Sequence, residues 1–154
     1  MIDEPPLTLQ DIHQAQGTIA NLVHKTPLLS AHSLGQMAGC QLFLKAENLQ
    51  RAGSFKIRGA FNKLAHLDPD QRARGVIAAS AGNHAQGLAL AASELGIPCT
   101  IVMPTLASIP KVEAPKGYGA SVLLHGKDYD QAQRYAQGVM RERLRQAGYA
   151  LGEE

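Results

Sequence analysis

Lys56 is the side chain in this sequence best placed to act as a nucleophilic amine. It follows Gly53, Ser54 and Phe55 and lies in the first turn of a helix that Ser54 is predicted to cap. The positive end of the helix dipole disfavours the ammonium form there, and a neutral amine can form a Schiff base with a carbonyl compound. The alternative on spacing alone is an exposed helix lysine that pairs with a carboxylate.

The second candidate site is the segment Ser80-Ala81-Gly82-Asn83-His84, which follows an apolar run and opens a predicted helix. In an open parallel sheet, ligands bind in the crevice at this end of the strands. The free backbone N–H groups at a helix start favour an anion, either a carboxylate or a phosphate. Ser80, Asn83 and His84 add side-chain donors, and Gly82 allows close approach of the backbone. The alternative is that Asn83 only caps the helix and His84 lies on the surface.

Other chemical patterns are absent from the sequence. The six histidines and two cysteines show no paired spacing typical of metal ligands, so no metal site is predicted. Cys40 and Cys99 are predicted to be buried free thiols in a reducing cytoplasm. Gly117-Tyr118-Gly119 does not continue into a dinucleotide-binding motif, and there is no P-loop.

Length and composition indicate an ordinary globular domain. The 154 residues are 45% hydrophobic and 18% charged, with a net charge of +2. This balance argues against a dedicated nucleic-acid surface or a polybasic membrane surface. No apolar stretch approaches the ~18 residues of a membrane span. The first ten residues include Asp3, Glu4 and prolines, unlike a signal peptide. The expectation is a soluble cytoplasmic protein.

The hydrophobic pattern alternates between helices and short apolar strands. Helices are predicted over 8–22, 30–39, 54–67, 83–95, part of 108–117 and 128–147, and strands over 42–45, 76–79, 99–103 and 121–124. Thr8 and Ser30 are the expected caps of the first two helices, and Asp68-Pro69 is expected to end the third. Such alternation predicts an α/β fold with βαβ crossovers and a parallel sheet.

Two long segments carry a family resemblance. KAENLQRAGSFKIRGAF, residues 45–61, resembles the lysine region of the threonine dehydratase and serine racemase family, and SAGNHAQG, residues 80–87, is similar to its asparagine loop. Members are pyridoxal-phosphate enzymes of the tryptophan-synthase β-like fold. Shorter matches are Thr26-Pro27-Leu28, Met103-Pro104, Lys111-Val112-Glu113-Ala114, Tyr118-Gly119-Ala120 and Leu124-His125-Gly126. The resemblance covers most of residues 20–135.

The resemblance implies an open parallel-sheet α/β sandwich of three layers and the elimination of water from L-threonine or L-serine, giving a 2-oxo acid and ammonia. Lys56 would bind the pyridoxal 5'-phosphate aldehyde and later take the α-proton, with Phe55 packed beside the cofactor. Asn83 would hydrogen-bond the cofactor's phenolic oxygen. The substrate carboxylate would be held by Ser80, Gly82, Asn83 and His84.

Finer features of the family bear on specificity and regulation. Racemases of the family tend to carry a second serine where this chain has Ala81, so the resemblance favours a dehydratase over a serine racemase. Gln86 and Tyr118 match positions near which nucleotide-activated members bind their effector. Isoleucine biosynthesis and serine deamination are the associated pathways. The full-length enzyme is expected to be a homo-oligomer.

The chain is expected to be the N-terminal part of such an enzyme. The glycine-rich phosphate loop and the partner of the pyridine nitrogen, which family members carry further along the chain, are missing. By the resemblance, residues 1–50 would belong to the large domain and 51–154 would form the small mobile domain. Little activity is expected from the chain alone, and Pro115 is expected to distort its helix. A catalytically dead domain that binds an amino acid or a protein partner is one alternative, and a nucleotide-binding module is another.

Overall fold

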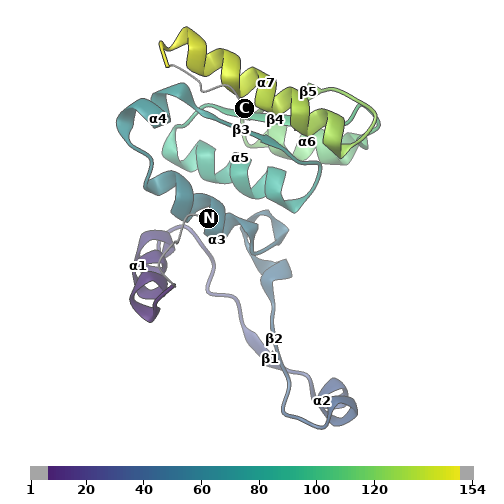
Figure 1. The fold of residues 1–154 in the computed structure, drawn as a ribbon. Coiled ribbons are helices and arrows are strands. Elements are labelled where there is room, and N and C mark those ends of the chain that lie inside the picture. The colour runs from purple at the N-terminus through teal and green to yellow at the C-terminus, as the bar shows by residue number, and fades with distance from the viewer. Residues whose placement is uncertain (1–6, 150–154) are drawn as a thin grey trace.

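A three-stranded parallel sheet organises the chain after residue 75 (Figure 1). A computed structural model describes residues 7–149, in which β3 (Val76–Ala79), β4 (Cys99–Met103) and β5 (Ser121–Leu124) pair in the order β3-β4-β5. Both pairings are parallel, with Ala78 opposite Ile101 and Ile101 opposite Val122. The acidic start of the chain and the segment from residue 150 onward lie outside the described residues.

Helices cover both faces of this sheet (Figure 1). Helices α5 (Asn83–Leu95) and α6 (Ile109–Gly117) pack on one face, and α7 (Tyr129–Gln146) packs on the other. Helix α3 (Lys56–Ala65) lies against the outer side of α5. The predicted α/β fold with a three-layer sandwich is therefore confirmed.

The period of two along β4 explains how one strand serves two cores. Ile101 and Met103 are fully buried in the cluster that α3, α5 and α6 share, whereas Val102 is fully buried in the cluster under α7. Helix α5 is rich in alanine on its buried side, and these small side chains allow it to lie close to both the sheet and α3. The continuous apolar run 99–103 is thus typical of a central strand buried on both faces.

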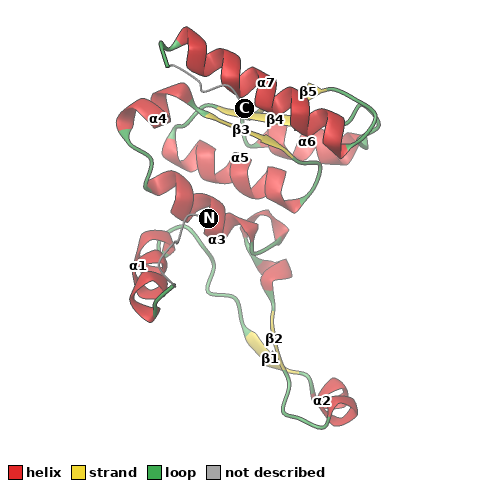
Figure 2. Cartoon of the chain, viewed as in Figure 1, coloured by secondary structure: helices red, strands yellow, loops and turns green. Residues whose placement is uncertain are grey.

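In the N-terminal part of the chain, residues 28–45 form an arm that projects from this sandwich (Figure 2). After α1 (Leu9–Ile19), strand β1 (Leu28–Ser30) pairs antiparallel with β2 (Phe43–Lys45), and α2 (His32–Ala38) lies between them. The arm leaves large apolar side chains exposed: Leu28, Leu29, Leu34, Met37, Phe43 and Leu44.

The base of the arm is joined to the sandwich by packing and polar contacts. Helix α1 packs on α3, and Ile19 and Leu22 are buried, whereas Leu9 and Ile12 are exposed. The buried Gln50 side chain accepts from the backbone N–H of His24 and donates to its carbonyl, both at 2.8 Å. Two short 3-10 turns, η1 (Glu47–Leu49) and η2 (Arg51–Gly53), then lead into α3.

Several helix boundaries differ from the sequence prediction. The first helix is capped by Thr8 as expected but ends at Ile19. A short helix that was not predicted, α4 (Pro69–Arg74), begins where only a helix end was expected. Asp68 accepts from Gln71 N at 2.7 Å and the Gln71 side chain bonds back, so a capping box with proline in the first turn starts a new helix.

Three expectations about single residues in the helices are wrong. The residues that cap α2 and α3 are Ala31 and Phe55, not Ser30 and Ser54. Pro115 does not interrupt α6, which runs from Ile109 to Gly117 with Pro115 buried in the core. Within residues 7–149, no helix combines the length and apolar character needed to cross a membrane.

Candidate active site

Lys56 is the first residue of α3 and its side chain is exposed. Ser54 is buried, and its Oγ accepts from the backbone N–H of Lys56 at 3.4 Å. Ser54 precedes the N-cap residue Phe55 and still stabilises the helix start through this bond. Just before it, Ala52 and Gly53 both have positive φ, 58° and 66°, which turns the chain sharply into α3. The Nζ atom of Lys56 lies 5.2 Å from the centroid of the Phe55 ring.

No carboxylate among the described residues forms an ion pair with Lys56. The three salt bridges within residues 7–149 join Arg51 to Glu94, Arg58 to Glu47 and Lys116 to Glu113. The alternative of an ordinary helix lysine paired with a carboxylate is therefore wrong for this part of the chain. The amine stands exposed beside an aromatic ring.

The segment 80–84 lies at the carboxyl end of β3, as predicted. The backbone N–H of Ser80 donates to the Val102 carbonyl at 3.0 Å, and the Ser80 hydroxyl accepts from Gly82 N at 3.4 Å. Gly82 is the N-cap of α5, and Asn83 is the first residue of the helix. No side chain caps this helix start with a hydrogen bond. The alternative that Asn83 serves as the cap is wrong, and its exposed side chain stays free to meet a ligand.

His84 connects this segment electrostatically to Lys56. Partial burial of the imidazole lowers the pKa of His84, and the positive charge of Lys56 lowers that pKa further. As a residue His84 is still exposed, as the surface alternative predicted. The starts of α3 and α5 lie close together, since a Cβ placed on Gly87 would lie 3.1 Å from the Lys56 Cβ.

The two predicted effector residues lie on helices that cover the same face of the sheet. Gln86 is in the first turn of α5 and is half-buried. Tyr118 closes α6, where its N–H donates to the Pro115 carbonyl at 3.1 Å and its ring packs against the main core. Their helices pack side by side.

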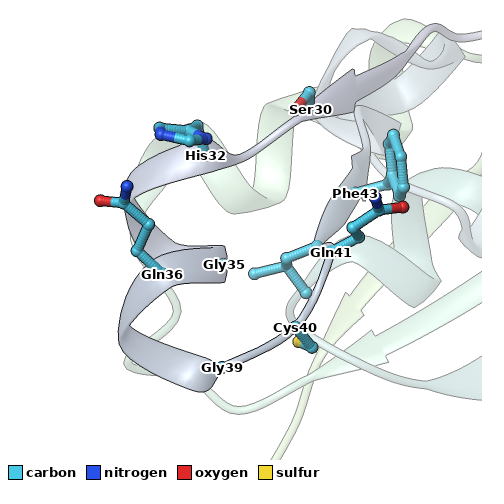
Figure 3. Close-up of a pocket in the computed structure, with 9 residues that line it drawn as sticks. Ser30, His32, Gly35, Gln36, Gly39, Cys40, Gln41 and Phe43 are labelled. Carbon is cyan, nitrogen blue, oxygen red and sulfur yellow. The ribbon is translucent and has the colours of Figure 1, made fainter.

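A large hollow lies elsewhere, in the projecting arm (Figure 3). It has a volume of about 720 Å³, and none of the predicted site residues lines it. It is bounded by Ser30, His32, Gly35, Gln36, Gly39, Cys40, Gln41, Leu42 and Phe43. The part of the chain that the structure describes contains no cluster of three or more His, Cys, Asp or Glu side chains fit to hold a metal ion.

Gly87 contacts the start of α3, and no role was predicted for it. It appears in the asparagine-loop segment, but only the structure brings it against the backbone of Lys56. The available signal was its place four residues after Asn83, on the same face of the helix.

Known proteins resemble this chain in both sequence and structure. The family described as "Pyridoxal-phosphate dependent enzyme" matches residues 19–152. The L-threonine ammonia-lyase of Thermotoga maritima is 54% identical over 126 residues, and the catabolic L-threonine dehydratase TdcB of Staphylococcus aureus is 47% identical over 137 residues. The structure of maize serine racemase is 41% identical with a TM-score of 0.80.

These alignments cover most of this chain and less than half of each relative. They span 82% of this chain and 31% of the Thermotoga protein, 88% and 40% for the Staphylococcus protein, and 88% and 41% for the maize structure. The family match includes both the Lys56 region and the segment 80–84. The chain belongs to the pyridoxal-phosphate dependent enzyme family.

Proposed function

We propose that this chain carries the lysine-bearing part of an enzyme that eliminates water from L-threonine or L-serine, giving a 2-oxo acid and ammonia. The relatives named L-threonine ammonia-lyase and L-threonine dehydratase support this substrate class. A cytoplasmic location, a homo-oligomeric full-length enzyme and a role in isoleucine biosynthesis or serine deamination belong to the same proposal.

One observation carries the proposal: the exposed Lys56 amine stands at a helix start beside an anion-binding segment. Within residues 7–149 no carboxylate neutralises the amine, and the pKa of His84 responds to its charge. A lysine held in this way is suited to bind an aldehyde covalently.

The residues present fit pyridoxal phosphate. Lys56 offers the amine, the exposed Phe55 ring lies 5.2 Å from that amine, and Asn83 has an exposed amide at the start of α5. In this proposal Lys56 holds the aldehyde carbon, Phe55 packs beside the ring and Asn83 donates to the phenolic oxygen. When bound, the cofactor supplies an electron sink for the charge left by loss of the α-proton.

The start of α5 would bind the substrate carboxylate. The backbone N–H groups of the first turn and the positive end of the helix favour a negative charge at this point. Ser80 and His84 add donors, and Gly82 has open space where a Cβ would stand. Because its pKa is lowered, His84 is a neutral donor near pH 7. The substrate's amine would first replace Lys56 on the aldehyde carbon, and the freed Lys56 amine would then be the base for the α-proton.

Position 81 favours a dehydratase over a racemase. A racemase needs an acid on the face of the substrate opposite Lys56, and the methyl group of Ala81 has no proton to give. The likeness to maize serine racemase keeps the racemase as the second candidate. The two reactions differ in product, because one releases a 2-oxo acid and the other a D-amino acid.

The domain division is also a proposal. Residues 1–50 would belong to a large domain and 51–154 to a small mobile domain. The exposed apolar side chains of the arm support the first part, since a patch of this kind marks a surface that packs against another. The packing of α1 and Leu22 against the sandwich ties the base of residues 1–50 to the small domain.

The first experiment tests the covalent bond. The purified chain is mixed with pyridoxal phosphate, reduced with borohydride and mapped by peptide mass spectrometry. The pyridoxyl group should be found on Lys56 and be lost in Lys56→Ala. Lys63→Ala, in the same helix and also exposed, is the matched control and should keep the adduct. Labelling that is equal on all exposed lysines would contradict the proposal.

The second experiment tests the reaction. L-threonine is added with pyridoxal phosphate, and 2-oxobutanoate is measured with the chain alone and with the chain extended by the C-terminal portion of a relative. Turnover is expected only in the extended protein, and rapid turnover by the chain alone would show that the added portion is unnecessary. Formation of D-serine from L-serine without pyruvate would favour the racemase.

A further inference from the structure

Gly87 lies where α5 packs closely against the start of α3. A Cβ placed on Gly87 would lie 2.9 Å from the backbone nitrogen of Ile57, 3.0 Å from the carbonyl carbon of Lys56 and 3.1 Å from the Lys56 Cβ. Two of these three atoms belong to the backbone at the start of α3, which cannot swing aside as a long side chain can. A side chain at position 87 would therefore push the two helices apart.

Glycine is not required for helix geometry at this position. Gly59 in α3 and Gly138 in α7 also lie within helices, and a Cβ on either would meet no atom within 4 Å. Alanine is favoured over glycine in a helix interior by about 1 kcal/mol, so a glycine there needs another reason. At position 87 that reason is the close approach of the Lys56 backbone.

This contact joins the two halves of the site. Gly87 is four residues after Asn83 and three after His84, so all three share one face of α5. On the other side of the contact, Lys56 begins α3 and Ile57 is fully buried. The contact therefore determines how far the Lys56 stem lies from the first turn of α5.

We propose that Gly87 is a positioning residue that sets the distance between Lys56 and the ligand-binding start of α5. The proposal rests on the proposed function for its catalytic meaning. Its packing part is independent, because it concerns only this chain's own backbone.

The test compares Gly87→Ala with Gly138→Ala, which adds the same methyl group inside an exposed helix. The first readout is the rate at which pyridoxal phosphate couples to Lys56, trapped with cyanoborohydride and quantified against Lys111 on α6. Because displacements of about 1 Å at reacting groups are costly, Gly87→Ala should slow Lys56 coupling on the order of tenfold or more. Coupling at Lys111 should not change, and Gly138→Ala should behave as the unsubstituted chain.

A second aldehyde separates orientation from access. Formaldehyde is small and has no phosphate, and the long lysine stem keeps the amine in water, so its coupling to Lys56 should change by less than about twofold. If Gly87→Ala slows the coupling of pyridoxal phosphate to Lys56 but leaves that of formaldehyde unchanged, Gly87 positions Lys56. Unchanged pyridoxal phosphate coupling in a folded Gly87→Ala variant would overturn the proposal.

Amide hydrogen exchange at Ala60 keeps the proposal testable if no coupling occurs or if the variant does not fold. Ala60 is buried, and its amide is one turn after Lys56 in α3, where the helix supplies an acceptor. In the unsubstituted chain this amide should be strongly protected, and in a folded Gly87→Ala it should exchange about tenfold faster or more. Rapid exchange of the Ala60 amide in the unsubstituted chain would overturn the packing claim. Absence of any Lys56 adduct together with a protected Ala60 amide would contradict the proposed function and leave the packing claim supported.

Discussion

Arg58 donates two hydrogen bonds to the carboxylate of Glu47. Its Nε donates to Oε2 at 2.9 Å and its Nη2 donates to Oε1 at 2.8 Å. Glu47 Oε1 also accepts from the Thr26 hydroxyl at 2.5 Å, and Arg58 Nη2 donates to the His24 carbonyl at 3.3 Å. One carboxylate thus joins the base of the arm, the turn η1 and helix α3.

This cluster predicts acid sensitivity. The hydrogen bond from Arg58 is the largest influence that lowers the pKa of Glu47, to about 2 against an ordinary value of 4.5. Because the pKa is lower in the folded state, the stabilisation is complete above pH 4.5 and is lost as the pH falls towards 2. After allowance for solvent screening, it should amount to about 1 kcal/mol.

Urea unfolding at pH 6 and pH 3 measures this loss. Glu47→Gln should be less stable than the unsubstituted chain at pH 6 and should lose less stability on acidification. Glu113→Gln is the matched control, because the Glu113 side chain is 60% exposed in its ion pair. Equal acid sensitivity of Glu47→Gln and the unsubstituted chain would contradict the assignment.

The proximity of Lys56 and His84 predicts a coupled titration. Burial lowers the pKa of His84 most and the Lys56 charge lowers it further, so Lys56→Met should raise that pKa towards 6.5 without reaching it. NMR of the imidazole protons across pH measures the shift. Lys63→Met removes an equal charge from the same helix and should leave His84 unchanged; a shift of the same size there would show a general charge effect.

The two thiols should differ sharply in reactivity. Cys99 is buried as predicted, and this burial raises its pKa to about 11. The prediction that Cys40 is buried is wrong, because Cys40 lies in the projecting arm and is exposed. Since the thiolate is the nucleophile, a disulfide reagent at pH 8 should modify Cys40 in the folded chain and Cys99 only after unfolding. Cys40→Ser should then show no rapid phase, and rapid modification of that variant would place Cys99 at the surface.

The turn before Lys56 contains a residue, Ala52, whose backbone strain a substitution can relieve. Ala52 has φ 58° and ψ 18°, a left-handed conformation that costs a residue with a Cβ about 1 kcal/mol relative to glycine. Ala52→Gly should therefore raise the free energy of unfolding by up to about 1 kcal/mol, after the greater chain entropy of glycine is deducted.

Thermal and urea unfolding would measure this gain. Ala73→Gly, at an exposed position inside α4, should have the opposite sign, because glycine weakens a helix interior. A loss of stability in Ala52→Gly comparable to that in Ala73→Gly would show that the methyl group of Ala52 contributes packing that outweighs the strain.

Elements with a local cause were predictable from the sequence alone. The runs 76–79, 99–103 and 121–124 are the observed strands. Of these three, the central strand β4 is buried along its whole length, as its apolar run predicts, whereas the edge strands β3 and β5 are partly exposed. The helix over 83–95 matches α5 at both ends, since Gly96 adopts the left-handed conformation that ends a helix. The candidate residues Lys56 and 80–84 were found because their places at two helix starts follow from this local pattern.

Tertiary structure decided how those residues are arranged. Strand β1 has no apolar alternation of its own and exists because its backbone pairs with β2. The left-handed turn at Ala52 and the bidentate contact of Arg58 with Glu47 depend on segments that meet only in the folded chain. The closeness of Lys56 to α5 likewise depends on Gly87, and short-range patterning cannot report which glycine faces another helix. Sequence determined which groups could do chemistry, and packing between α3 and α5 brought the segments that carry them close together.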